Sequence, residues 1–114
     1  MGETNSAKPG GLEPGRKQSL ASLVEYQTGS VVSRTIINRN SGSVTLFAFD
    51  EGEGLSEHTS PYDALVHILE GEALITVAGV GEDVREGEAM ILPAGEPHAL
   101  RAKKRFKMVL TMIR

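Results

Sequence analysis

Short stretches rich in Val, Ile, Leu and Thr recur along residues 31–113, and each is bounded by Gly, Pro, Asn or charged residues. This spacing is typical of short β-strands joined by tight turns. No helical period of comparable length interrupts them. The pattern predicts an all-β sandwich or barrel. Its expected strands are Val31–Asn38, Val44–Phe49, Leu55–Thr59, Ala64–Leu69, Ala73–Val77, Asp83–Arg85, Glu88–Leu92, His98–Ala102 and Phe106–Ile113.

Two of these predicted strands carry apolar residues on both faces. In Ala64–Leu69, alternation places Val66 on one face and Leu65 on the other. Phe106–Ile113 alternates between two largely apolar sets in the same way. One wall of a barrel covers only one face of a strand. We therefore expect a second subunit to pack sheet against sheet, which predicts a homodimer.

The first thirty residues differ from the rest of the chain. Residues 1–18 are rich in Gly and Pro and nearly devoid of large apolar side chains, so we expect a flexible N-terminal arm. Ser19–Tyr26 is a short connector whose Leu20, Leu23 and Val24 can pack against the barrel rim. A chain of 114 residues has room for one core, so residues 19–114 are expected to form a single domain.

Composition excludes several classes of function. The net charge of −3 and the pI near 5.6 provide no broad basic surface, so we expect no nucleic-acid partner. The chain has no cysteine, which excludes disulfides and thiolate metal ligands. It has neither an apolar run long enough to span a membrane nor a signal-peptide pattern. A cytoplasmic protein without a membrane partner is the expectation.

The stretch from Gly87 to His98 places a histidine at a fixed distance from residues that constrain the backbone. Pro93 lacks an N–H and ends the preceding strand, and Gly95 permits a positive φ in the next turn. His98 then begins a new strand, where its imidazole can face the barrel interior. The spacing resembles the second motif of the cupin superfamily: Gly, five residues, Pro, one residue, Gly, two residues, His, three residues, Asn. The last position is Ala102 here.

The first cupin motif reads Gly, five residues, His-x-His, three or four residues, Glu, six residues, Gly, and part of it is present upstream. Gly52, His58 and Gly71 occupy matching positions, whereas Ser60 and Ala64 stand where the family has its second histidine and its glutamate. The resemblance implies a double-stranded β-helix, which is a jelly-roll barrel of the RmlC-like kind. In metal-binding cupins it also implies three histidines and a glutamate around Fe, Mn, Ni, Zn or a similar ion.

Only His58 and His98 remain at the ligand positions that the resemblance implies. We expect them to hold a divalent transition metal weakly, with water, Asp63 or substrate oxygens completing the shell. Tyr62 and Asp63 are candidate catalytic residues at the barrel mouth, although a purely structural turn role fits both. His67 should lie on the face opposite the vacant glutamate position, so it becomes a ligand only if a bulge inverts the strand.

These residues leave two classes of function open. In the first, the metal acts as a Lewis acid on a small carbonyl- or hydroxyl-bearing molecule such as a sugar derivative. The resemblance then implies an isomerase- or lyase-like sugar enzyme, with a dioxygenase disfavoured by the incomplete ligand set. In the second, the barrel is a metal-free module that binds or senses a small molecule without turnover. Arg34, which lies in an apolar strand, either binds a carboxylate inside the barrel or points outward.

Overall fold

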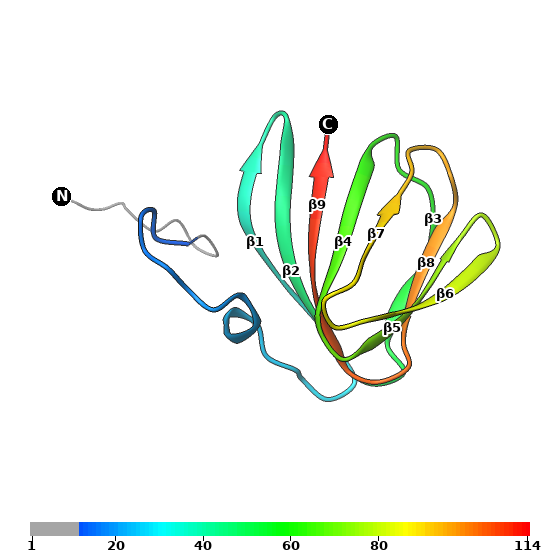
Figure 1. Cartoon of the computed structure of the whole chain (residues 1–114), viewed down its shortest axis with the longest axis horizontal. Helices are drawn as coiled ribbons and strands as arrows, with labels where there is room; N and C mark the ends of the chain where they lie inside the picture. Colours follow the sequence, from blue (N-terminus) through cyan, green and yellow to red (C-terminus); the bar gives the residue numbers. More distant parts are fainter. Residues whose placement is uncertain (1–11) are drawn as a thin grey trace.

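A computed structural model describes residues 12–114, and Figure 1 shows the strands gathered into one all-β body. Residues 1–11 of the predicted arm lie outside the described residues, and residues 12–18 contain no helix or strand. The elements are a short 3-10 helix, η2 (Leu20–Leu23), and the strands β1 (Val31–Arg39), β2 (Gly42–Phe49), β3 (Gly54–His58), β4 (Asp63–Glu70), β5 (Glu72–Val77), β6 (Val80–Arg85), β7 (Ala89–Leu92), β8 (His98–Ala102) and β9 (Phe106–Ile113).

The strands form two antiparallel sheets. Sheet A has the order β1-β2-β9-β4-β7, and sheet B has the order β3-β8-β5-β6. Figure 1 shows the C-terminus, the β3–β4 loop and the β7–β8 loop at the same end of the molecule. The all-β fold predicted from the strand pattern is confirmed, and so is the jelly roll that the cupin resemblance implies. Its crossovers bring strands that are far apart in the chain, such as β3 and β8, into direct pairing.

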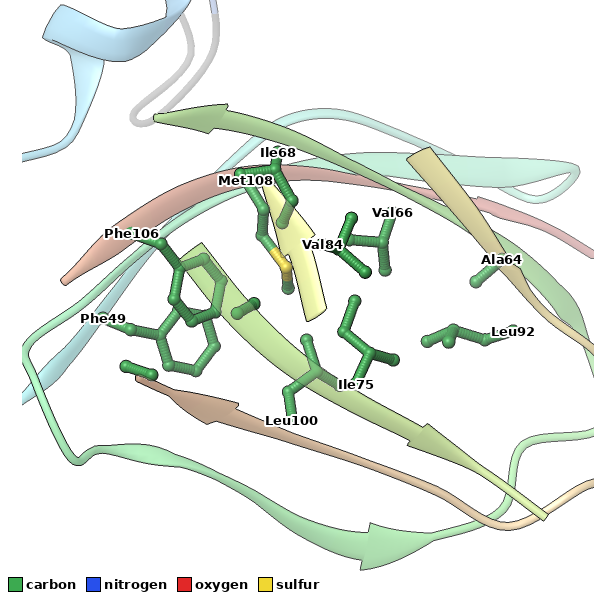
Figure 2. Close-up of a cluster of buried hydrophobic side chains, with 12 residues drawn as sticks. Phe49, Ala64, Val66, Ile68, Ile75, Val84, Leu92, Leu100, Phe106 and Met108 are labelled. Atoms are coloured by element: carbon green, nitrogen blue, oxygen red, sulfur yellow. The ribbon is translucent and has the colours of Figure 1, made fainter. Parts of the chain in front are cut away.

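The core fills the space between the two sheets. Figure 2 shows inward side chains of both sheets meeting there. The rings of Phe49 and Phe106 are stacked, with their centroids 4.4 Å apart. Each fully buried Val, Leu, Ile, Phe or Met side chain contributes about 1.5–3 kcal/mol to folding. The cluster consists of Phe49, Ala64, Val66, Ile68, Ala73, Ile75, Val84, Leu92, Leu100, Ala102, Phe106 and Met108.

The outer face of sheet A is partly covered by the chain's own N-terminal segment, residues 19–26, which we call the strap. Its Val24 is buried and packs with Leu46, Ala48 and Val109. The segment was expected to be a connector at the barrel rim. It instead forms a 3-10 helix and covers a sheet face. The outer side of β9 therefore obtains part of its cover from the same chain, and the apolar character of that side does not by itself require a second subunit.

A polar clasp fastens the strap to sheet A. The Lys107 ammonium donates a hydrogen bond to the carbonyl of Ala21 at 2.5 Å and lies 3.9 Å from the Glu70 carboxylate. The Tyr26 hydroxyl donates to the same carboxylate at 2.7 Å. Burial, together with the hydrogen bond to Glu70, raises the pKa of Tyr26, so its phenol stays protonated. The clasp thus satisfies a lysine that is itself nearly buried.

Gly71 and Gly87 have left-handed backbone conformations in quite different surroundings. Their φ angles are +84° and +83°. A Cβ atom on Gly71 would overlap the carbonyl oxygen of Arg105 and lie 2.7 Å from the Cα of Phe106. A Cβ atom on Gly87 would meet no atom within 4 Å. Both glycines supply a turn, but only Gly71 also permits close approach of two backbone segments.

Candidate functional site

The two histidines that the spacing singled out are brought together by strand pairing. β3 and β8 pair antiparallel, with Leu55 opposite Leu100 and His58 opposite His98. Leu55 and His58 are three residues apart on β3, whereas their partners Leu100 and His98 are two residues apart on β8. β3 therefore has one extra residue between Leu55 and His58, as in a β-bulge. Without it, alternation would place His58 on the outer face of sheet B. The irregularity therefore keeps both imidazoles on the inward face, next to one another.

The imidazole rings meet through their Nε2 atoms. The two Nε2 atoms are 3.2 Å apart, and the rings are arranged edge to face, with an interplanar angle of 74°. The Nδ1 atom of His58 lies 2.8 Å from the carbonyl oxygen of Ser56. A carbonyl can only accept, so Nδ1 of His58 carries the proton and its Nε2 presents a lone pair. His98 then donates from Nε2 to His58.

Burial distinguishes the two histidines electrostatically. His98 is only 5% exposed, whereas His58 is exposed. Burial, and next to it the neighbouring His58, lowers the pKa of His98, while the backbone of Glu96 opposes this shift more weakly. His98 is therefore neutral at pH 7. Its Nδ1 atom is buried and makes no hydrogen bond. Such an atom has hydrogen-bonding capacity left over, which is unusual in a protein interior.

The candidate Tyr62 lies in the loop between β3 and β4, and the candidate Asp63 is the first residue of β4. The Asp63 carboxylate accepts a hydrogen bond from the backbone N–H of Ala94 at 2.8 Å, which ties β4 to the loop after β7. The backbone N–H of Tyr62 donates to the Ser60 hydroxyl at 3.2 Å, and its side chain is 38% exposed. Within residues 12–114, no three His, Asp or Glu side chains gather closely enough to hold a metal ion. The structure therefore does not bring Asp63 to the histidine pair.

His67 and Arg34 both lie on the outer face of sheet A. β4 alternates regularly, so His67 is exposed on the side opposite the buried Ala64, next to Val109 of β9. Arg34 donates a hydrogen bond from Nη1 to the carbonyl of Leu23 in the strap at 3.1 Å. Neither side chain faces the interior, so the alternative in which Arg34 binds a carboxylate inside the barrel is wrong.

Sequence reasoning missed the Ser56 carbonyl, which orients the His58 ring. The only signal was a pair of consecutive polar residues, Ser56 and Glu57, which breaks the alternation between Leu55 and His58. Such a break is compatible with a bulge but also with the end of a strand. The contact became visible only when the pairing of β3 with β8 was known.

Each sheet has a row of inward-facing residues at the end of the molecule that carries the pair. Cross-strand pairing defines the upper row of sheet A, which consists of Asn38, Ser43, Met112, Ala64 and Leu92. The corresponding row of sheet B consists of His58, His98, Val77 and Val80. Ala64 is the position where the cupin motif has its glutamate. In this chain a methyl group stands there, flanked by two larger apolar side chains.

Comparison with known families decides the assignment of the fold. A family model described as a cupin domain matches residues 45–114. The chain belongs to the cupin family. The matched region contains both histidines and every strand from β3 to β9, so this cupin has its candidate site within the shared domain. None of the curated proteins matches the chain.

Solved structures agree with this assignment. The cupin is 33% identical to a conserved protein of unknown function from Streptococcus pyogenes, with a TM-score of 0.88 and coverage of 97% of each chain. It is 34% identical to a cupin superfamily protein from Desulfitobacterium hafniense, with a TM-score of 0.86 and coverage of 94% of this chain and 98% of that one. A cupin 2 conserved barrel domain protein from Leptotrichia buccalis is 39% identical over 82% of this chain and 46% of its own length, with a TM-score of 0.80.

The described part of this cupin contains no helix that is long and apolar enough to cross a membrane.

Proposed function

We propose that His58 and His98 together hold a divalent transition-metal ion, at which a small molecule with carbonyl or hydroxyl oxygens binds. The convergence of their Nε2 atoms to 3.2 Å carries this proposal. Two imidazole nitrogens, each about 2.1 Å from one ion, are about 3.0 Å apart at a right angle and about 3.4 Å apart at the tetrahedral angle. The observed separation lies between these values, so the pair fits one ion without a large movement of either ring.

The surroundings of both rings support the same proposal. A metal-binding histidine commonly donates its other ring N–H to a carbonyl, which fixes the tautomer. The Ser56 carbonyl does this for His58. For His98, ion binding would move the proton from Nε2 to the unpartnered Nδ1, near the backbone of Glu96. Because burial lowers the pKa of His98, an ion would not have to compete with a charged imidazolium at this residue at neutral pH.

Such an ion would act as a Lewis acid, polarising a carbonyl or hydroxyl oxygen of the bound molecule. The chain supplies two nitrogen ligands, so the affinity is expected to be modest and most coordination positions are left to water and substrate. Asp63, the first residue of β4, is already hydrogen-bonded to Ala94, so we assign it a role in positioning the adjoining β3–β4 loop rather than in binding the ion. Tyr62, exposed in the same loop, is the candidate proton donor to a substrate at the barrel mouth.

A metal-free binding module is the second candidate function. The direct hydrogen bond from His98 to His58 favours it, because the two Nε2 atoms already have one another as partners without an ion. A ligand hydroxyl or carbonyl would then exchange hydrogen bonds with the two rings. In this case binding would be independent of metal.

We also infer that a second copy covers the part of sheet A that the strap leaves open. One outward row crosses all five strands, with Ile37, Val44, Thr111, Leu65 and Ile91 in register. Ile37, Leu65 and Ile91 are 47%, 43% and 63% exposed. An exposed apolar row of this width supports the homodimer expected from the sequence.

The metal proposal is tested by elemental analysis of the protein purified without an affinity tag, followed by re-addition of Fe(II), Mn(II), Ni(II) or Zn(II) with a thermal-shift readout. An ion at one hundred times its Kd stabilises the fold by about 2.7 kcal/mol. We expect this shift to disappear in His58→Ala and His98→Ala. The matched control is His67→Ala, which removes an exposed histidine from the outer face of sheet A.

Two results would contradict the metal site. One is retention of the ion by both His58→Ala and His98→Ala. The other is loss of the shift in His67→Ala to the same extent. Absence of metal and of any thermal shift, combined with binding of a small molecule that depends on His58, would instead establish the metal-free module.

A further inference from the structure

The histidine pair occupies the last position of the ladder between β3 and β8. His58 is the final residue of β3 and His98 is the first residue of β8, so the ladder ends at the pair. On the other side, the extra residue between Leu55 and His58 interrupts the ladder. A pair of residues between a strand end and a bulge has weak backbone support on both sides. Strand pairing alone therefore gives limited control over the contact between the two rings.

The loops that adjoin the two histidines are held together by hydrogen bonds of their own. The β3–β4 loop begins directly after the first histidine of the pair, and the β7–β8 loop ends directly before the second. The backbone N–H of Gly95 donates to the carbonyl of Ser60 at 2.8 Å. The neighbouring N–H of Ala94 donates to the Asp63 carboxylate, also at 2.8 Å. The two loops therefore connect the histidines by a second route, in addition to the ladder.

The Asp63 carboxylate extends the contact between β4 and β7 beyond the end of their ladder. The last backbone pair of that ladder is Ala64 with Leu92. Ala94 lies two residues past Leu92, in the β7–β8 loop, and its N–H is taken up by the Asp63 side chain. Hydrogen bonds to a charged acceptor are shorter and roughly twice as strong as neutral ones. Asp63 therefore fastens the β7–β8 loop to the start of β4.

Of the two histidines, His98 is the one that is fixed independently of this contact. The carbonyl of Pro97, the residue before it, accepts a hydrogen bond from the N–H of Ala78 in the β5–β6 turn at 2.8 Å. His98 is also buried, whereas His58 is exposed. The position of His58 relative to His98 therefore depends on the loop that follows His58, and on the contact of that loop with the β7–β8 loop.

We infer that Asp63 is a positioning residue of the histidine pair. Through the Ala94 N–H it keeps the β7–β8 loop against the start of β4, where the next residue, Gly95, can hold Ser60 and with it the end of β3. This arrangement keeps the two Nε2 atoms in contact, although Asp63 itself touches neither ring. The inference rests on the observed contact of the rings and not on a bound ion, so it applies to either of the functions proposed above.

The test is NMR of the imidazole nitrogens in the full chain, labelled with 15N-histidine, dialysed against EDTA and measured at pH 8. The hydrogen bond to His58 fixes His98 as the Nε2–H tautomer. His67, exposed on sheet A, is the internal reference for a ring with mixed tautomers. In Asp63→Ala the His98 signals should shift toward those of the reference, because the acceptor moves away. Exchange of the Ala94 amide proton should become about tenfold faster.

Two further variants show whether the effect belongs to this contact. Asp63→Asn keeps an oxygen at the acceptor position and should restore the His98 signals. The matched control is Glu88→Ala, which removes another carboxylate that accepts a backbone N–H, that of Arg85, at 2.8 Å across the β6–β7 turn. Glu88→Ala should leave the His98 signals unchanged.

A folded Asp63→Ala variant with unaltered His98 signals would overturn the inference, and so would an equal shift of these signals in Glu88→Ala. Circular dichroism checks the fold of each variant. If Asp63→Ala does not fold, Asp63→Glu provides the test, because its extra methylene group displaces the acceptor from the Ala94 N–H. The same shift of the His98 signals is then expected, and its absence would overturn the inference. Since the ion has been removed, the outcome does not depend on whether the metal proposal holds.

Discussion

Gly71 and Gly87 offer a matched pair of substitutions, because both have φ angles near +84° while their surroundings differ. Each also occupies a glycine position of a cupin motif. We predict that Gly71→Ala is far more destabilising than Gly87→Ala. The difference would show that the first motif needs its final glycine for close packing of two backbone segments, rather than for the turn alone.

The expected sizes follow from the contacts of the added methyl group. At either site, alanine in a left-handed conformation costs about 1–2 kcal/mol, offset by about 0.4–1 kcal/mol because the unfolded chain becomes less flexible. Gly87→Ala should therefore cost about 1 kcal/mol. At Gly71 the methyl group also overlaps the Arg105 carbonyl and lies 2.7 Å from the Cα of Phe106. Phe106 is held by its stack on Phe49, so relief is limited, and overpacking adds about 1–3 kcal/mol or more.

Urea unfolding monitored by circular dichroism measures the free energy of unfolding of each variant. Thermal melting gives an independent check, since a loss of 1 kcal/mol lowers Tm by about 4 °C. We expect Tm to fall by about 4 °C in Gly87→Ala and by about 12 °C in Gly71→Ala. Equal destabilisation of the two variants, within 0.5 kcal/mol, would refute the steric argument. It would mean that the backbone strain common to both sites accounts for the whole effect.

Three further predictions concern the strap, the histidine pair and the outer face. Lys107→Met should lower the free energy of unfolding by about 1–3 kcal/mol and speed proteolysis of the strap, because the Ala21 carbonyl loses its hydrogen-bond donor. In the control, Lys103→Met at an exposed site should change the free energy of unfolding by less than about 0.5 kcal/mol. Equal effects of the two variants would contradict the role of Lys107 in holding the strap. The pKa of His98 lies below the usual histidine value of 6.5, so as pH falls the unfolded chain takes up a proton before the folded protein does. The stability of the metal-free protein should therefore fall as pH drops through 6.5. Urea midpoints measured at several pH values should depend less on pH in His98→Gln, and an unchanged pH dependence would be inconsistent with this assignment. Ile91→Lys should convert the proposed dimer to a monomer in light scattering, whereas Val80→Lys, at a similarly exposed site on sheet B, should not. A monomeric starting protein would disprove the proposed dimer.

Most of the fold could be predicted because strand alternation is a local property. The ends of His98–Ala102 and Phe106–Ile113 were predicted to the residue. The main underestimate was β6, which begins at Val80 rather than Asp83. Gly81 and Glu82 have weak strand preferences and extend β6 only because β5 is there to pair with them. Local preference identifies a strand, whereas the neighbouring strand decides where it starts.

The strap shows a different limit. The strap contains too few apolar residues for a periodic pattern to predict a helix. A 3-10 helix of this length is stable only when it packs on another surface. That surface contains Leu46 and Val109, which come from strands distant in the chain. The periodicity of the sequence alone therefore could not predict which sheet face the strap covers.

At the candidate site, spacing identified His58 and His98, because turn residues set the distance of each histidine from its motif glycine. Spacing could not reveal the direct contact of the two rings, the Ser56 carbonyl behind one of them, or the engagement of Asp63 by Ala94. Each of these contacts depends on how one strand or loop is placed against another. The exact partner of a side chain is a property of register and not of sequence distance.

The position of β9 at the centre of sheet A constrains the order of events during synthesis. β9 follows all the other strands in the chain, yet it is the partner of both β2 and β4. The strap, synthesised early, must wait for Lys107, which lies 86 positions after Ala21. Until residues 106–113 leave the ribosome, β2 and β4 have open edges and Leu46 lacks its neighbour Val109. The sheet edges of β2 and β4 are therefore exposed until β9 emerges, and we expect sheet A to close in a late step of folding.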